Sequence, residues 1–131
     1  MGEKKLKITI GDVVATANLL EADAPKTAKA VWDALPIDGY LNHANFSGEE
    51  CSFPCYPMLY EKENQLYNTE HGDLGYFVQG PAICIYYGPM RVISPGNVFA
   101  RIVSNLDAVR KVCRSTWKDT GVAIKIERQE A

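Results

Sequence analysis

One short segment of the sequence carries side chains that could do acid–base chemistry. His43 titrates near neutrality, so it can serve as a general acid or a general base. Glu50 lies shortly after Ser47 and could orient that histidine or act as a base itself. We take His43, Ser47 and Glu50 as the candidate catalytic residues, suited to hydrolysis, isomerisation or lyase chemistry.

Further polar residues could bind the substrate of such a site. Arg91 can hold a carboxylate through two parallel hydrogen bonds. Tyr87 and Asn97 can donate hydrogen bonds to a carbonyl group or to a developing oxyanion. Glu49 adds a second carboxylate to the pocket. The predicted ligand is therefore a small polar acid or amide.

The same residues also have structural interpretations. A histidine near a strand end, such as His43, more often has a structural role in packing than a catalytic role. Glu49 and Glu50 are equally well explained as a solvated loop pair, and Arg91 could simply pair with a surface carboxylate. Asn97 follows a proline–glycine pair, which is typical of turns. The functional interpretation depends on the three loops meeting on one face of the fold.

The four cysteines divide into two groups. Cys51 and Cys55 have the spacing C-x3-C, which differs from the C-x2-C of zinc ribbons and thioredoxin-like motifs. With His43 nearby they could bind a metal or form a redox pair, but the sequence shows no second ligand cluster, and we predict no metal and no cofactor. Cys84 and Cys113 lie in apolar patterns, where buried and inert thiols are expected.

These residues must be positioned by a fold that is mainly β with two helices. Alternation of apolar and polar residues predicts several strands, joined by Gly- and Pro-containing turns. Apolar residues at helical spacing predict one helix that begins at Pro25 and is stopped by Pro36 and Gly39, and a second that leads to Trp117. The predicted strands cover residues 6–10, 13–20, 74–78, 82–87, 98–103 and 122–126, with mixed strand and loop after residue 39. This pattern favours a single domain, residues 1–131, built as a closed antiparallel barrel with its openings covered by helices.

Composition limits the classes of function. The chain has 131 residues, of which 47% are hydrophobic and 23% charged, as in ordinary globular proteins. A net charge of -2 argues against nucleic acid and anionic membranes as partners. The sequence shows no membrane span or signal peptide, so we expect a cytoplasmic protein with free thiols. Tyrosines in the loops (Tyr56, Tyr60 and Tyr67) suggest a homodimer.

The order of these parts resembles the cyclophilin family over nearly the whole chain. The strand pair followed by the acidic helix start with its Pro-Lys-Thr-Ala sequence is similar to the cyclophilin opening. The similar segments are LLEADAPKTAKAVWDAL, NHANFSG, VFARIVSNLDAVRKV and GVAIKIERQ. The resemblance implies an eight-stranded antiparallel β-barrel with two capping helices.

The candidate site departs from the pattern of cyclophilin prolyl isomerases. Ala44 stands after His43, where the family carries the arginine that binds the peptide. The apolar pair that lines the proline pocket in the family falls near Glu49 and Glu50 of this sequence, and the histidine that closes the far side of that pocket falls near Gly96 or Asn97. The resemblance is greater to the small bacterial cyclophilin-like proteins. The segments HANFSGEE, YYGPMR and PGNVFA of this chain resemble segments of that group. These departures argue against prolyl isomerase activity.

Three functions follow as hypotheses. The first is an enzyme or binding protein for a small polar ligand, using the polar residues above. The second is a prolyl isomerase or peptide-binding module without the usual arginine, which would need an open apolar groove. The third is a structural subunit of an oligomer, which would bury those polar residues against a partner.

Overall fold

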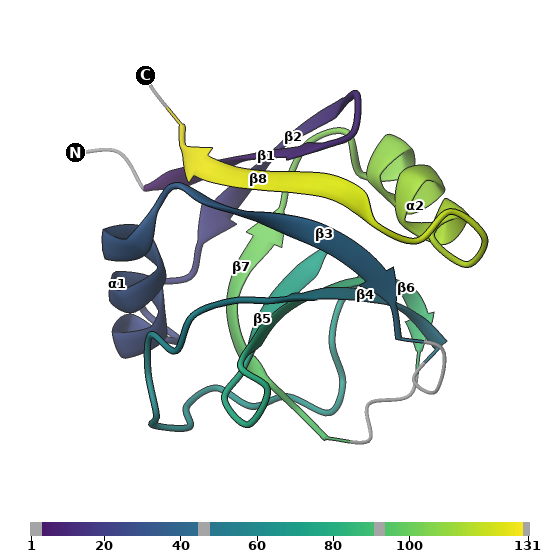
Figure 1. Cartoon of the computed structure of the whole chain (residues 1–131). Helices are drawn as coiled ribbons and strands as arrows, with labels where there is room; N and C mark the ends of the chain where they lie inside the picture. The colour runs from purple at the N-terminus through teal and green to yellow at the C-terminus, as the bar shows by residue number, and fades with distance from the viewer. Residues whose placement is uncertain (1–3, 45–47, 91–93, 130–131) are drawn as a thin grey trace.

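The computed structural model describes residues 4–44, 48–90 and 94–129. Its strands form a closed barrel in the order β1-β2-β7-β5-β6-β4-β3-β8, and every neighbouring pair is antiparallel. Figure 1 shows α1 and α2 on opposite sides of this barrel. The elements are β1 (Lys5–Ile10), β2 (Val13–Leu19), α1 (Pro25–Ala34), β3 (Ile37–His43), β4 (Gly48–Pro54), β5 (Asp73–Phe77), β6 (Ala82–Met90), β7 (Asn97–Ile102), α2 (Leu106–Ser115) and β8 (Val122–Arg128). The predicted fold class, a mainly antiparallel closed barrel with two helices, is confirmed.

Strand alternation explains how the barrel is filled. Leu6, Ile8 and Ile10 of β1 are fully buried, while the residues between them are partly exposed. Because successive side chains of a strand point to opposite faces, one face of each strand supplies the interior. Both helices add to this interior, since Val31 of α1 and Val109 of α2 belong to the same hydrophobic cluster.

The region after α1 differs from the sequence prediction. The helix ends at Ala34, ahead of Pro36, but Gly39 does not belong to the helix stop because it lies inside β3. A Cβ atom at Gly39 would lie 2.7 Å from Cδ2 of Phe53, so the Phe53 ring occupies the space that a side chain would need. Glycine at this position therefore allows β3 and the aromatic ring of β4 to approach closely.

β3 and β4 pair over a short length only. Asn42 pairs with Ser52 and His43 with Cys51, whereas residues 37–41 of β3 pair with β8 on the other side. The two strands therefore diverge toward the start of β3 and the end of β4. Within the described ranges, no helix is long and apolar enough to cross a membrane.

Candidate functional site

Glu49 and Glu50 point to opposite sides of β4. The Glu49 carboxylate reaches α2, where it accepts hydrogen bonds from Arg114 Nε at 3.1 Å and Nη2 at 2.9 Å. Glu50 is paired directly with Tyr86 of β6, so both side chains lie on the same face of the sheet. The neighbouring Cys51 belongs to the barrel core, which places Glu50 on the outer face.

On this outer face, Glu50 meets two side chains of β6. The Cys84 thiol donates a hydrogen bond to the Glu50 carboxylate, and the Tyr86 ring lies beside them. Glu50 is only 9% exposed, and Cys84 and Tyr86 are buried as well. We call Glu50, Cys84 and Tyr86 the outer-face cluster.

Burial keeps the two acidic groups around Glu50 in their protonated forms. It raises the pKa of the Cys84 thiol well above its usual value, and the Glu50 charge raises that pKa further. Burial also raises the pKa of the Tyr86 phenol, with smaller contributions from Cys84 and Glu50. Near neutral pH, Cys84 and Tyr86 therefore keep their protons, so an S–H group and an O–H group lie beside Glu50.

Two glycines fix the position of Tyr86. A Cβ atom at Gly75 would lie 2.7 Å from the Tyr86 hydroxyl oxygen, so the ring lies directly over this residue of β5. The backbone amide of Gly96 donates a hydrogen bond to the same oxygen. The phenol is thus held from two sides, and a side chain at Gly75 would displace it.

The outer face continues into a buried ion pair that the sequence analysis did not identify. Asp73 pairs directly with Tyr86 across β5 and β6, and its side chain is completely buried. Arg101 of β7 donates a hydrogen bond to Asp73 Oδ1 at 2.7 Å, and the Glu70 amide donates one to Oδ2. The hydrogen bond to Asp73 is the main reason that the pKa of Arg101 is raised.

His43 lies at the barrel end that α2 covers. Its Nε2 shares a hydrogen bond of 2.6 Å with the Tyr87 hydroxyl, and its ring packs at 4.5 Å between centroids on Trp117. His43 pairs with Cys51 in the ladder, so it shares the inner face with Cys51 and not the outer face with Glu50. The structure brings His43 and Tyr87 together and places Glu50 on the other side of the sheet.

Glu49 belongs to the same end of the barrel as His43. The Arg114 hydrogen bonds lower the pKa of Glu49, and Arg110, at 3.7 Å, lowers it further. A Cβ atom at Gly88 would collide with the Glu49 carboxylate, which therefore lies close against β6. Glu49 connects β4 to α2 and is already held by two cations.

Asn97 lies in a separate, fully buried position at the start of β7. Its Oδ1 accepts hydrogen bonds from the Glu63 amide and from Gln65 Nε2, both at 3.1 Å. Its Nδ2 donates to Thr27 Oγ1 at 3.1 Å and to the Glu61 carbonyl at 2.9 Å. These four bonds use its whole hydrogen-bonding capacity and tie the loop before β5 to α1.

The remaining predicted site residues, Ser47 and Arg91, lie outside the described residues. The thiols of Cys51 and Cys55 have different surroundings. Cys51 lies against Thr116 Oγ1 at 3.2 Å in the core, whereas Cys55 lines a surface hollow. Among the residues described, no group of three or more His, Cys, Asp and Glu side chains could hold a metal ion.

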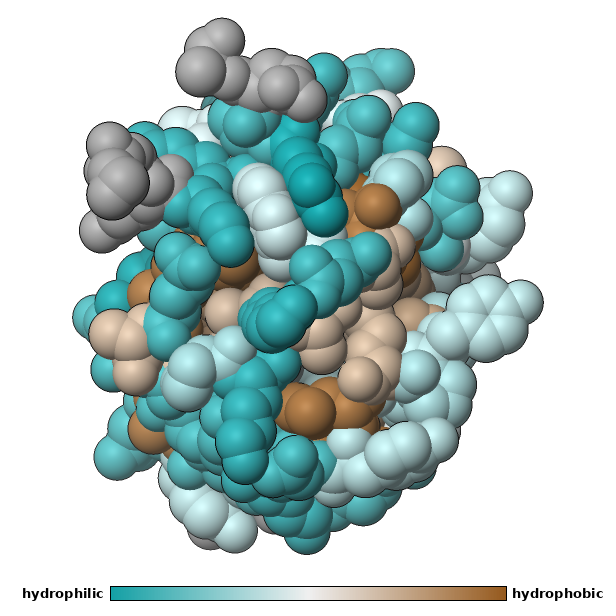
Figure 2. All heavy atoms as spheres, turned by 90° about the vertical axis from the view of Figure 1, so that its left-hand side faces the viewer, coloured by the Kyte–Doolittle hydropathy of each residue, from teal (hydrophilic) through white to brown (hydrophobic). Residues whose placement is uncertain are grey.

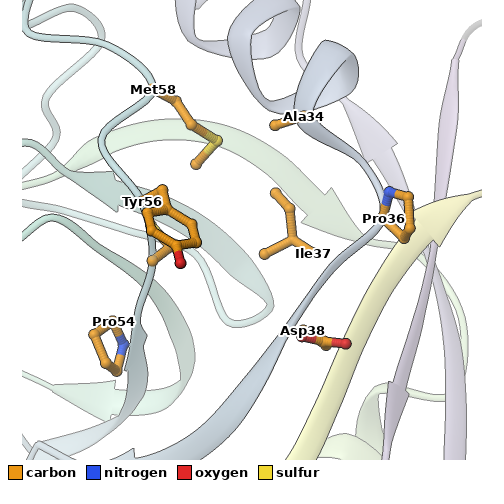
Figure 3. Close-up of a pocket in the computed structure, with 8 residues that line it drawn as sticks. Ala34, Pro36, Ile37, Asp38, Pro54, Tyr56 and Met58 are labelled. Atoms are coloured by element: carbon orange, nitrogen blue, oxygen red, sulfur yellow. The ribbon is translucent and has the colours of Figure 1, made fainter.

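The hollow beside Cys55 is a feature that the sequence did not suggest. It has a volume of about 370 Å³ and lies between the α1–β3 junction and the segment that follows β4. In Figure 3, Tyr56 and Met58 line one side, opposite Ala34 and Ile37 on the other. Figure 2, which faces the α1 side of the molecule, shows apolar surface patches between hydrophilic side chains.

Comparisons with known proteins agree with this architecture. A family described as "Protein of unknown function (DUF3830)" matches residues 6–127. McbB, whose structure was solved in complex with tryptophan, is similar in fold, with a TM-score of 0.84 and 23% identity. The match covers 96% of this chain but only 45% of McbB, so the chain spans less than half of that protein.

A second solved structure matches along almost its whole length. The hypothetical protein AF2241 of Archaeoglobus fulgidus has a TM-score of 0.73 and 29% identity, over 97% of this chain and 95% of its own. A search of curated proteins finds no match.

Proposed function

Because this chain belongs to the DUF3830 family, whose description assigns no activity, we propose a function from the geometry: it binds a small amide or acid on the outer face of β4 and β6, with Glu50 as the acid–base group. Hydrolase, isomerase or lyase chemistry on the bound molecule is part of this proposal. We also propose that the barrel is cyclophilin-like, as the sequence resemblance implies.

The observation that carries the proposal is the burial of the Glu50 carboxylate beside protonated Cys84 and Tyr86. Buried carboxylates are costly, and side chains with perturbed ionisation gather at functional sites more often than elsewhere. The cluster combines an acceptor, the Glu50 carboxyl group, with a hydroxyl donor, Tyr86. A neutral amide carries the complementary groups, because its N–H can donate to Glu50 while its carbonyl accepts from the Tyr86 hydroxyl.

This chemistry favours an amide over an ionised acid among the two predicted ligand classes. An ionised acid carries only acceptors at its charged end, whereas an amide offers both an N–H donor and a carbonyl acceptor. McbB, which shares this fold over 45% of its length, was solved in complex with tryptophan, and this supports a small ligand of amino-acid type. We therefore choose N-acetyl-L-tryptophanamide as the amide probe and N-acetyl-L-tryptophan as its acid counterpart.

The test is a titration of the ¹⁵N-labelled protein with each probe, followed by NMR chemical shifts. We expect the amide to shift the signals of β4 and β6 around Glu50 and Tyr86, and to bind more tightly than the acid. Glu50→Gln should weaken binding about tenfold, because a neutral amide oxygen replaces the carboxylate as acceptor and its NH2 group meets the thiol that donates to Glu50.

Glu49→Gln is the matched control, since Glu49 lies next to Glu50 but faces α2. Its affinity for the amide should equal that of the wild type. Equal losses of affinity in Glu50→Gln and Glu49→Gln, or chemical-shift changes confined to strands other than β4 and β6, would overturn the proposed site.

A further inference from the structure

The hollow beside Cys55 exists because β3 and β4 separate. Their ladder ends at Asn42 and Ser52, and Phe53 then packs its ring against Gly39. Past this contact, toward the start of β3, the space between the two chain segments stays open and forms the cavity of about 370 Å³. This volume falls within the range of small-molecule sites, about 300–1,000 Å³.

The walls of the hollow are mostly apolar and come from two segments. Ala34, Pro36 and Ile37 form the side next to α1. Opposite them, Tyr56 and Met58 point across the space (Figure 3). The tyrosine ring presents a flat aromatic surface, and the proline and isoleucine side chains present aliphatic ones, so these walls suit a flat or branched hydrocarbon body.

One lining side chain carries a charge. Asp38 follows Ile37 in β3, lines the hollow and is exposed. Its cross-strand neighbour Lys125 lies 3.7 Å from Glu127, and Asp38 makes no ion pair with any residue in the described ranges. The carboxylate is thus available to a cation that enters from solvent.

We propose that this hollow is a second ligand site, which binds a small molecule with an aromatic or branched apolar body and a protonated amine. The body lies between Ile37 and Tyr56, and the ammonium group pairs with Asp38. Apolar contacts alone would not orient the molecule, whereas the single carboxylate fixes its polar end and repels an anion of the same shape.

The hollow is separate from the outer-face cluster. Pro54, which lines it, lies four residues after Glu50, about 13 Å along an extended strand. A ligand in the hollow therefore need not touch Glu50, and the two proposals stand independently.

Cys55 provides the readout because its thiol lines the hollow and is the only one of the four cysteines that is not buried. Burial raises its pKa to about 11, so alkylation is slow but measurable in mild base. We would follow iodoacetamide labelling by intact mass at about pH 8.5, where an alkylamine is still protonated. The probes are phenethylamine, phenethyl alcohol and 3-phenylpropionate, which share an aromatic ring and differ in charge.

We expect phenethylamine to slow alkylation of Cys55 at least threefold, the alcohol to slow it less, and the acid to leave it unchanged. Asp38→Asn should reduce protection by the amine to the level of the alcohol. The control Asp12→Asn removes an exposed carboxylate from the β1–β2 turn and should preserve full protection. Absence of protection, equal protection by amine and acid, or full protection in Asp38→Asn would each overturn the proposal.

Discussion

Glu49 and Glu50, adjacent in sequence, place their carboxylates on opposite sides of β4. Glu49 is held at 2.9 Å by Arg114 of α2, whereas Glu50 faces Tyr86 on the outer surface of the barrel. The first carboxylate connects a helix to the sheet, and the second is buried beside groups that can donate hydrogen bonds to a ligand. Adjacent residues of one type thus serve different purposes because a strand alternates its faces.

The Glu49 ion pair predicts a pH-dependent contribution to stability. Arg114 lowers the pKa of Glu49 in the folded state, so the pair stabilises the protein above the unfolded glutamate pKa of about 4.3. That stability is lost as the pH falls through the lower folded value. Glu49→Gln should therefore reduce the free energy of unfolding by less than about 1 kcal/mol at neutral pH, and by less still in acid.

Urea unfolding of wild type and Glu49→Gln from neutral pH down into acid measures this difference. The control repeats both unfolding measurements in an Arg114→Gln background. Most of the stability difference caused by Glu49→Gln should then vanish, because Arg114 donates the hydrogen bonds to Glu49. If the difference in unfolding free energy between wild type and Glu49→Gln stayed constant with pH, the Glu49–Arg114 ion pair would not be its cause.

Asn97 is predicted to hold the loop before β5 in place. Asn97→Ala removes four hydrogen bonds from a fully buried position and should cost about 2–4 kcal/mol of stability. Gln65→Ala removes only one of those bonds and should cost about 1 kcal/mol or less. Denaturation curves give the energies, and faster hydrogen exchange at the Glu63 amide would localise the change. If both variants lost the same stability, Asn97 would not have this central role.

The regular parts of the fold could be predicted from local patterns. Leu6, Ile8 and Ile10 alternate with polar residues because β1 has one buried and one exposed face. Pro25 marks the start of α1 for a similarly local reason, its fixed φ angle. The prediction that Gly39 helps to stop the helix is wrong because the place of Gly39 in β3 depends on its contact with Phe53, a residue of another strand that local sequence does not reveal.

The candidate site was harder to predict because its partners are distant in sequence. β6 is buried from Ile83 to Gly88, so its sequence has no polar alternation to show which face each tyrosine takes. The sequence therefore favours Tyr87 as a ligand-binding residue, whereas the structure places Tyr86 beside Glu50. The partners of Asn97 illustrate the same difficulty, since Thr27 lies 70 residues away.

The two adjacent tyrosines provide the last prediction, which rests on the proposed function. Tyr86→Phe removes the hydroxyl next to Glu50 and Cys84, so binding of N-acetyl-L-tryptophanamide should weaken about threefold to tenfold, as expected for one neutral hydrogen bond. Tyr87→Phe removes the hydroxyl that contacts His43 on the inner face and should leave that affinity unchanged. NMR titration of both variants measures the affinities, and thermal unfolding shows whether each barrel remains intact. Weaker binding in Tyr87→Phe alone would move the ligand site to the His43 end of the barrel and reject the outer face.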